Sequence, residues 1–440
     1  MKSLISLLMF SLCWAAQAAP DPAAPAAPPA AREPYVRQRN DGPGKRTLEV
    51  AARRFVLPGR PEVWLIGAVH IGDAAYYSTV QKLLDTQEIV LFESVGRPEF
   101  IDIPLDTDAN RALRTRKGLE EVIGQATWYR NSFMTLPVDA ETLGKAQVRN
   151  NRSIEVPWLR LAAIDGWGRP VSWKVAGDKI TVTSFGVDGQ PGGDGTAADI
   201  VATVDFTGKP FVDLKEFSLQ RSLATSLGLA FQLDCIRYDD PRFQSCDMTA
   251  KQMTDTIKLL DRQGEEPGQP GQPGDPGSGE RKLTELMQMM RGGSISSSVA
   301  KIALQMLQMS PKSQVAIKYM LAEMLALAGS DLEKMIAQDE ATRKLMQAIL
   351  HERNQVVLAG IRSAMEKKPA PASLAVFYGA AHMDAVELAL VRDLGYAPAE
   401  TRWFSAFFVD LAAAGMKEAD FAFFRAMVET KRRTLPPKNP

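Results

Sequence analysis

The chain has 440 residues, with 52 Lys and Arg against 52 Asp and Glu, and 45% of its residues are hydrophobic. A formal net charge of +0 gives no indication of binding to nucleic acid or anionic membranes, and 24% charged residues are ordinary for a folded soluble protein. The length allows two or three domains.

The N-terminus has the three parts of a secretory signal peptide. Lys2 supplies the positive charge, residues 4–14 are apolar, and residues 16–18 (AQA) form a small-x-small cleavage site. Cys13 leaves lipidation open as an alternative, although the residues before it are not small. No later stretch reaches the roughly 20 apolar residues that a transmembrane helix needs. We therefore expect a periplasmic or secreted chain without a transmembrane anchor.

Cleavage at this site leaves two cysteines, Cys235 and Cys246. In an oxidising compartment two cysteines predict one disulfide, which would contribute roughly 3 kcal/mol by closing a short loop. Two buried thiols are the alternative. A CxxC pair, the usual spacing of cysteine metal ligands, is absent from the sequence.

The first ordered elements are expected after an Ala/Pro-rich lead, so that ordered structure begins near Thr47. Residues 62–68 (EVWLIGA) form a short apolar run and predict a strand. Residues 74–86 have apolar side chains at helical spacing, and residues 88–93 (EIVLFE) predict a second strand. A strand, a helix and a strand in this order predict a parallel βαβ unit and an α/β fold.

The middle of the chain has a different character. From residue 107 to about 207 it begins with helical patterns and becomes rich in Gly, Asp and β-branched residues, with strands expected near 171–174 and 180–184. A helix is expected to resume at Ser218. The Gly/Pro-rich stretch 264–279 has no apolar side chain larger than proline, which is typical of a flexible linker.

The C-terminal part is predicted to be mainly helical. Residues 282–367 are rich in methionine, which suits adaptable core packing. Residues 374–378 (LAVFY) predict another strand, followed by a helix over 383–394. Residues 417–434 predict an amphipathic closing helix.

Two of the three histidines occur in nearly the same context, His70 in GAVHI and His382 in GAAHM. Each follows a predicted strand, and Glu93 ends the neighbouring strand of the βαβ unit. Because ligands of open α/β sheets bind at the carboxyl ends of the strands, we expect these three side chains to meet at one sheet edge. A structural role is the alternative for a single histidine, but the repeated GAxH favours a site. His351 lies mid-helix and outside this pattern.

Two histidines and one carboxylate are typical ligands of Mn, Co, Fe or Zn, and they leave positions for water and substrate. A metal there would lower the pKa of its bound water and polarise a carbonyl. Glu93 as general base is the alternative to Glu93 as ligand. A glycine lies three residues before each histidine, and we interpret it as allowing close approach of the backbone to metal or substrate.

These residues give the chain a resemblance to the TraB/GumN/Tiki family, which is related to erythromycin esterase-like and haem-binding ChaN-like proteins. The resemblance rests on GAVHIG and LFE, then on SLGLAFQLDCIRYDDPRFQSCDMT, Arg353-Asn354 and FYGAAH, and covers about residues 47–103 and 217–402. It implies a mainly parallel α/β fold of two related halves with flanking helices. It also implies divalent-metal hydrolysis of a peptide (or ester) bond, with Arg353 among the catalytic residues.

The stretch between these blocks is similar to the C-terminal domain of the major pseudopilin of type II secretion. Residues 165–170 (DGWGRP) and 184–200 (SFGVDGQPGGDGTAADI) carry this second resemblance, which implies a small α+β domain with a calcium loop. Asp188 and Asp199 match the acidic ligands, and Asp194 is a substitute for an acidic position that is alanine here. Carboxylates between glycine turns suit calcium, which prefers oxygen ligands. The alternative is a series of solvent-exposed Asp/Gly turns that binds no ion.

Together the patterns and resemblances predict seven segments: a signal peptide (1–18), a disordered lead (19–46), the first part of a hydrolase domain (47–105), a pseudopilin-like insert (106–212), the second part (213–263), a linker (264–280) and the third part (281–440).

The function predicted from the sequence is therefore an exported metal-dependent hydrolase acting on a peptide or protein substrate. A non-catalytic envelope protein that binds haem, a metal or a secretion-apparatus partner is the alternative. The presence of His70, Glu93 and His382 together favours the enzyme, because a scaffold needs none of them.

Overall fold

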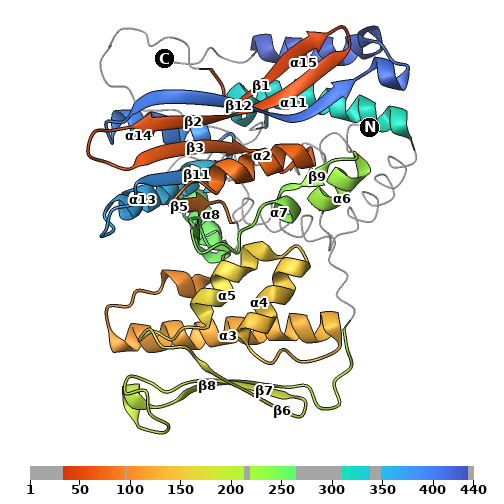
Figure 1. Ribbon diagram of the computed structural model, residues 1–440. Coiled ribbons are helices and arrows are strands. Elements are labelled where there is room, and N and C mark those ends of the chain that lie inside the picture. Colours follow the sequence, from red (N-terminus) through yellow and green to blue (C-terminus); the bar gives the residue numbers. More distant parts are fainter. Residues whose placement is uncertain (1–32, 95–96, 213–218, 264–309, 337–347, 435–440) are drawn as a thin grey trace, which may run out of the picture. The chain divides into compact units, whose positions relative to one another are not determined.

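The computed structural model describes residues 33–94, 97–212, 219–263, 310–336 and 348–434 (Figure 1). The predicted signal peptide, the first half of the predicted lead (residues 19–32) and the predicted linker lie outside these residues. Within the described ranges, no helix is both long and apolar enough to cross a membrane.

The chain forms two compact units. The α/β unit consists of Met1–Glu93, Phe217–Ile236 and Gln252–Pro440, and the insert unit consists of Ser94–Glu216 and Arg237–Lys251.

The centre of the α/β unit is a parallel sheet of three strands, β3 (Glu62–Ala68), β11 (Ser373–Gly379) and β5 (Ile89–Phe92). Strand β11 lies between the other two, with Gly379 opposite Ala68 and Phe377 opposite Phe92 (Figure 1). The three strands are buried almost throughout, because a parallel strand is covered on both faces and reads as a continuous apolar run. The predicted βαβ unit is confirmed, with α2 (Ala74–Leu84) as its helix.

Antiparallel strands extend this sheet beyond β3. The long strand β2 (Lys45–Val56) pairs with β3 and with β1 (Val36–Gly42) along one side, and with β12 (Ala397–Asp410) along the other. The α/β class is confirmed, and the central pairs β3–β11 and β11–β5 are parallel, whereas the pairs of β2 are antiparallel. Strand β12 was not predicted, and its side chains are mostly exposed or half-buried.

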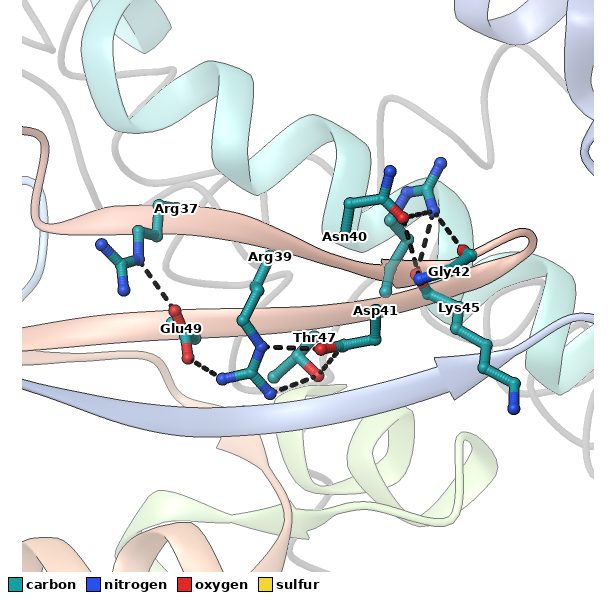
Figure 2. Close-up of polar contacts among 9 residues, drawn as sticks. Arg37, Arg39, Asn40, Asp41, Gly42, Lys45, Thr47 and Glu49 are labelled. Atoms are coloured by element: carbon teal, nitrogen blue, oxygen red, sulfur yellow. Dashed lines mark hydrogen bonds and ion pairs between the residues drawn. The ribbon is translucent and has the colours of Figure 1, made fainter.

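Ordered structure begins earlier than predicted, since β1 starts at Val36 rather than near Thr47. The physical reason is a set of contacts that the Ala/Pro-rich composition did not indicate. Tyr35 is buried and donates a hydrogen bond to Glu387 (2.8 Å). On one face of the β1–β2 hairpin, Arg37 and Arg39 both bond to Glu49 (Figure 2).

Helices cover the α/β unit. The principal ones are α11 (Pro311–Ile336), α13 (Arg353–Met365), α14 (Met383–Arg392) and α15 (Ala422–Thr434), and a π-helical turn (Ala348–Glu352) precedes α13. The helix expected to resume at Ser218 is short: α6 (Leu219–Ser226) ends before Gly228, whose φ of +64° favours glycine. The chain then forms the two-residue strand β9 (Ala230–Phe231), paired with β4 (Ile71–Gly72), and the short helix α7 (Gln232–Cys235).

The insert unit has an α+β architecture of helices and a three-stranded antiparallel sheet. Its helices are α3 (Asp108–Phe133), α4 (Ala140–Arg149) and α5 (Val156–Ala162), and its sheet has the order β6 (Ser172–Ala176), β7 (Lys179–Ser184) and β8 (Ile200–Asp205). Helix α3 packs on β7 and β8 over an apolar core that includes Leu119, Val122, Ala126, Ile180, Val182 and Phe206.

The insert unit is larger than the predicted range 106–212, because residues 94–105 and 237–251 belong to it. Polar contacts hold these two segments together. The buried carboxylate of Asp247 accepts the Ser94 amide (2.9 Å), and the guanidinium of Arg97 donates to the Asp247 carbonyl. Side-chain pairing between segments about 150 residues apart leaves no signal in the local sequence pattern.

Candidate active site

The structure brings together the two histidines of the repeated motif and the glutamate that was predicted at the same sheet edge. His70 follows β3, Glu93 follows β5 and His382 follows β11, so all three lie at the carboxyl ends of adjacent parallel strands. The Glu93 amide continues the ladder by donating to the Phe377 carbonyl (3.1 Å). Hydrogen bonding between neighbouring strands therefore determines how close the three side chains lie.

Glu93 is buried, and both of its carboxylate oxygens accept hydrogen bonds. Oε1 accepts from Arg353 Nη2 (2.6 Å), and Oε2 accepts from the Gly379 amide (2.7 Å). Burial by itself raises the pKa of this carboxyl. The positive charge of Arg353, with smaller contributions from His382 and His70, outweighs burial and lowers the pKa to about 2. Glu93 is therefore ionised throughout the physiological range.

His382 is fully buried between two partners on α13. Its Nδ1 lies 2.8 Å from Asn354 Oδ1, and its Nε2 lies 3.5 Å from Arg353 Nη1. An amide oxygen only accepts, so Nδ1 carries the proton and Nε2 presents a lone pair to the guanidinium. Burial and then the charge of Arg353 lower the pKa of His382 to about 3, which keeps the ring neutral. The Tyr378 ring packs edge-on against it at 5.4 Å.

His70 is the most accessible member of the cluster, being half-buried where the other three are buried. Gln232 makes two hydrogen bonds to His70. The Gln232 amide donates to the His70 carbonyl (2.9 Å), and the two side chains are hydrogen-bonded. Burial lowers the pKa of His70, and Arg353 lowers it further, while Glu93 opposes this shift. A neutral, reachable imidazole is ready to accept a proton.

Arg353 links the cluster. Its side chain is fully buried, pairs with Glu93 and lies 5.7 Å from the centre of the Tyr378 ring. A buried guanidinium needs a compensating carboxylate, and Glu93 provides it. Arg353 begins α13 directly after the π-helical turn, a feature that is frequent at functional sites.

The arrangement does not fit the predicted three-ligand metal site. Both oxygens of Glu93 already have donors, and the guanidinium of Arg353 faces Nε2 of His382, where a cation would be repelled. Among the residues that the structure describes, no three His, Cys, Asp or Glu side chains are grouped as metal ligands. A metal held by His70, Glu93 and His382 stays a prediction, and it requires Arg353 to move.

Gln232, Asn354 and Tyr378 also contact the cluster, although the histidine motif did not point to them. The available signals are weak: a glutamine in the apolar run LGLAFQL, and an asparagine beside Arg353. His351 lies in the π-helical turn and is half-buried; none of the contacts given above for the cluster involves it.

The two motif glycines pack closely or donate a hydrogen bond at the cluster, and their predicted approach to a metal or substrate stays a prediction. A Cβ on Gly67 would lie 3.0 Å from Val50 Cγ1 and 3.2 Å from Ala380 Cβ, so Gly67 allows close packing within the sheet unit. Gly379 donates its amide to Glu93. Both glycines therefore support the cluster through packing or backbone bonding.

The predicted calcium residues lie in the loop between β7 and β8 of the insert unit. Gly186 and Gly193 have positive φ values, and a Cβ on either would come within 2.6 Å of the Ala197 carbonyl oxygen, so only glycine fits. Asp188 and Asp194 are exposed.

Asp199 is half-buried, and its Oδ1 is buried without a hydrogen-bond partner in the described part of the chain. An unpartnered carboxylate oxygen in a turn series suits a cation with oxygen ligands. Since no three acidic side chains are grouped among the described residues, backbone carbonyls would have to complete the site. Calcium in this loop stays a prediction.

We expect calcium to raise the melting temperature of the insert unit by about 2–4 °C, because a ligand that binds only the native state stabilises it. Differential scanning calorimetry of the full chain with millimolar calcium measures this shift. Asp199→Asn should abolish it, while magnesium at the same concentration is the ion control. An unchanged wild-type transition would contradict the calcium prediction.

Cys235 is half-buried in the α/β unit, and Cys246 is buried in the insert unit. Burial, together with the charge of Asp247, raises the pKa of the Cys246 thiol to about 12. The structure has both residues as thiols and does not show the predicted disulfide, which stays a prediction.

Comparison with known proteins identifies the insert. Residues 106–203 match the family described as type II secretion system (T2SS), protein G, so this part of the chain is pseudopilin-like, as predicted. The match covers none of the cluster residues. No curated protein and no solved structure matches the chain.

Proposed function

We propose that the chain is a hydrolase of the cell envelope that cleaves a peptide (or ester) bond at the cluster of His70, Glu93, Arg353 and His382. The fold we propose with it is the pair of related halves implied by the resemblance to the TraB/GumN/Tiki family. One observation carries the proposal: an ionised, fully bonded Glu93–Arg353 pair lies beside two imidazoles of lowered pKa at the carboxyl ends of parallel strands.

The differences in burial among the cluster residues suggest which of them acts as the general base. Because His70 is the accessible member, it is the general base in this proposal. It takes a proton from water as the water oxygen attacks the carbonyl carbon. It then returns that proton to the leaving amine or alcohol as the bond breaks, which balances the reaction. Burial keeps both imidazoles neutral, with a further contribution from the charge of Arg353, and Glu93 holds the guanidinium in place.

The test is hydrolysis of a quenched-fluorescent peptide library and an ester panel by the purified mature protein, with metal content measured on the same samples. We expect turnover that Glu93→Gln reduces by about 10²-fold or more. Glu120→Gln in the insert unit is the matched control and should keep full activity. Turnover that survives removal of all Mn, Co, Fe and Zn supports the arrangement seen here; turnover that follows metal content supports a metal site formed after Arg353 moves.

The insert favours a second candidate function, a binding protein that contacts a secretion system. The observation behind it is the family match over residues 106–203. Wild-type protein that hydrolyses no member of either panel, with or without added metal, would overturn the hydrolase and leave this candidate.

A further inference from the structure

The cluster has the outer hydrogen-bond partners that are typical of a metal centre. A histidine that binds a metal through one ring nitrogen usually donates the other ring N–H to an oxygen, which fixes the orientation of the ring. His382 has such a partner, because its Nδ1 lies 2.8 Å from Asn354 Oδ1. Glu93 Oε2 likewise accepts the Gly379 amide (2.7 Å). These contacts leave Nε2 of His382 and Oε1 of Glu93 for a partner inside the cluster.

The guanidinium of Arg353 is that partner. Its Nη2 donates to Glu93 Oε1 (2.6 Å), and its Nη1 lies 3.5 Å from His382 Nε2. The second contact is long for a hydrogen bond, but it leaves no room for an ion between the two nitrogens. The His70 ring interacts electrostatically with both Arg353 and Glu93. All three predicted metal ligands therefore have the same guanidinium as a neighbour.

The charges of the cluster are already balanced. Glu93 contributes one negative charge and Arg353 one positive charge, while both imidazoles are neutral. A divalent ion added beside the guanidinium would leave two uncompensated positive charges among side chains that are mostly buried. Because uncompensated charge in a protein interior is strongly unfavourable, the cluster has no electrostatic need for a second cation.

The position of Arg353 opposes its displacement. Its side chain is fully buried, and it is the first residue of α13, which packs on β5 and β11, the strands that lead to Glu93 and His382. Moving the guanidinium out would separate it from the buried carboxylate of Glu93. A metal would therefore have to offset both the loss of this ion pair and a rearrangement at the start of the helix.

We propose that Arg353 is the resident cation of the cluster: its guanidinium occupies the place between Glu93 Oε1 and His382 Nε2 in which a divalent metal would have to bind, and it excludes Mn, Co, Fe and Zn from the native chain. The role of this cation in hydrolysis rests on the proposed function. A guanidinium donates hydrogen bonds and carries a fixed positive charge, but it does not acidify a bound water as a metal does. Removal of the proton from water therefore depends on His70.

The test compares metal uptake by the full-length wild type, Arg353→Ala and Arg402→Ala, which removes an arginine of β12 outside the cluster. Each protein is incubated with Co²⁺ or Zn²⁺, desalted and analysed for metal content. We expect Arg353→Ala to gain about one equivalent relative to the other two proteins, because two imidazoles and a carboxylate remain together without the guanidinium. Adding His382→Ala to Arg353→Ala should abolish this gain. Zn²⁺ should raise the melting temperature of Arg353→Ala and leave that of the wild type unchanged.

The wild-type measurement is decisive even if Arg353→Ala does not fold. Metal that the wild type retains and that His382→Ala alone removes would overturn the proposal, because Arg353 would then have moved aside. A folded Arg353→Ala that gains no metal would also overturn it, since the guanidinium would not be what excludes the ion. None of these measurements uses a substrate. Absence of turnover in the hydrolysis assay would therefore overturn the proposed function and leave the resident cation in place.

Discussion

Arg353→Met is expected to lower the free energy of unfolding by about 3–5 kcal/mol at neutral pH, because it leaves the buried carboxylate of Glu93 without its charge partner. Arg353 and Glu93 are both buried, so water does not take the place of the missing charge when one of the two side chains is replaced. Methionine keeps much of the volume of the arginine stem. The decrease in the free energy of unfolding should therefore come from the missing charge rather than from a cavity.

The pH dependence of stability should change sign in this variant. In the wild type the pKa of Glu93 is about 2, below its ordinary value of 4.5, so its stabilising effect is present above pH 4.5 and is lost as the pH falls towards 2. Without Arg353, burial dominates and raises the pKa. The folded variant then favours the protonated acid, and it becomes less stable as the pH rises above the ordinary pKa of 4.5.

Urea denaturation of wild type and variant at pH 5 and pH 8 measures both effects. The difference between the two proteins should be larger at pH 8. The double variant Arg353→Met with Glu93→Gln should recover part of the loss, because it removes the uncompensated charge. Arg402→Met, at a half-exposed arginine of β12, is the control. Equal losses at both pH values would contradict an ionised Glu93–Arg353 pair.

His70→Gln is expected to reduce kcat/KM by about 10²–10⁴-fold on any substrate that the hydrolysis assay identifies, while the protein stays folded. Glutamine preserves polarity at this half-buried position but cannot take a proton from water. His351→Gln, which changes the same residue type outside the cluster, should leave the rate unchanged.

The pH dependence of the hydrolysis rate gives an independent test of His70 as the general base. The base acts only when neutral, and the pKa of His70 lies below the ordinary 6.5. The wild-type rate should therefore be constant above pH 6.5 and fall as the pH drops below it. The residual rate of His70→Gln should lack that acid limb. A variant with wild-type turnover, or an unchanged acid limb, would remove His70 from the mechanism.

Much of the fold around the cluster could be predicted from local pattern. Residues 62–68 and 88–93 are short apolar runs typical of strands buried on both faces, and the helix between them favours a parallel arrangement. The two GAxH motifs follow such strands, so their position at one sheet edge follows from chain direction. The pseudopilin-like insert was indicated by a family resemblance of residues 165–170 and 184–200, and the family match over residues 106–203 supports it.

The identity of the charge partner was decided only by the tertiary structure. Arg353 is 260 residues from Glu93, and it reaches the carboxylate because α13 packs against β5 and β11. A sequence pattern records the spacing along one element, whereas this contact depends on how a distant helix packs. The sequence thus placed two histidines and a glutamate at one sheet edge. The structure put a buried cation among them, because an ionised carboxylate in the core is stable only beside a positive charge.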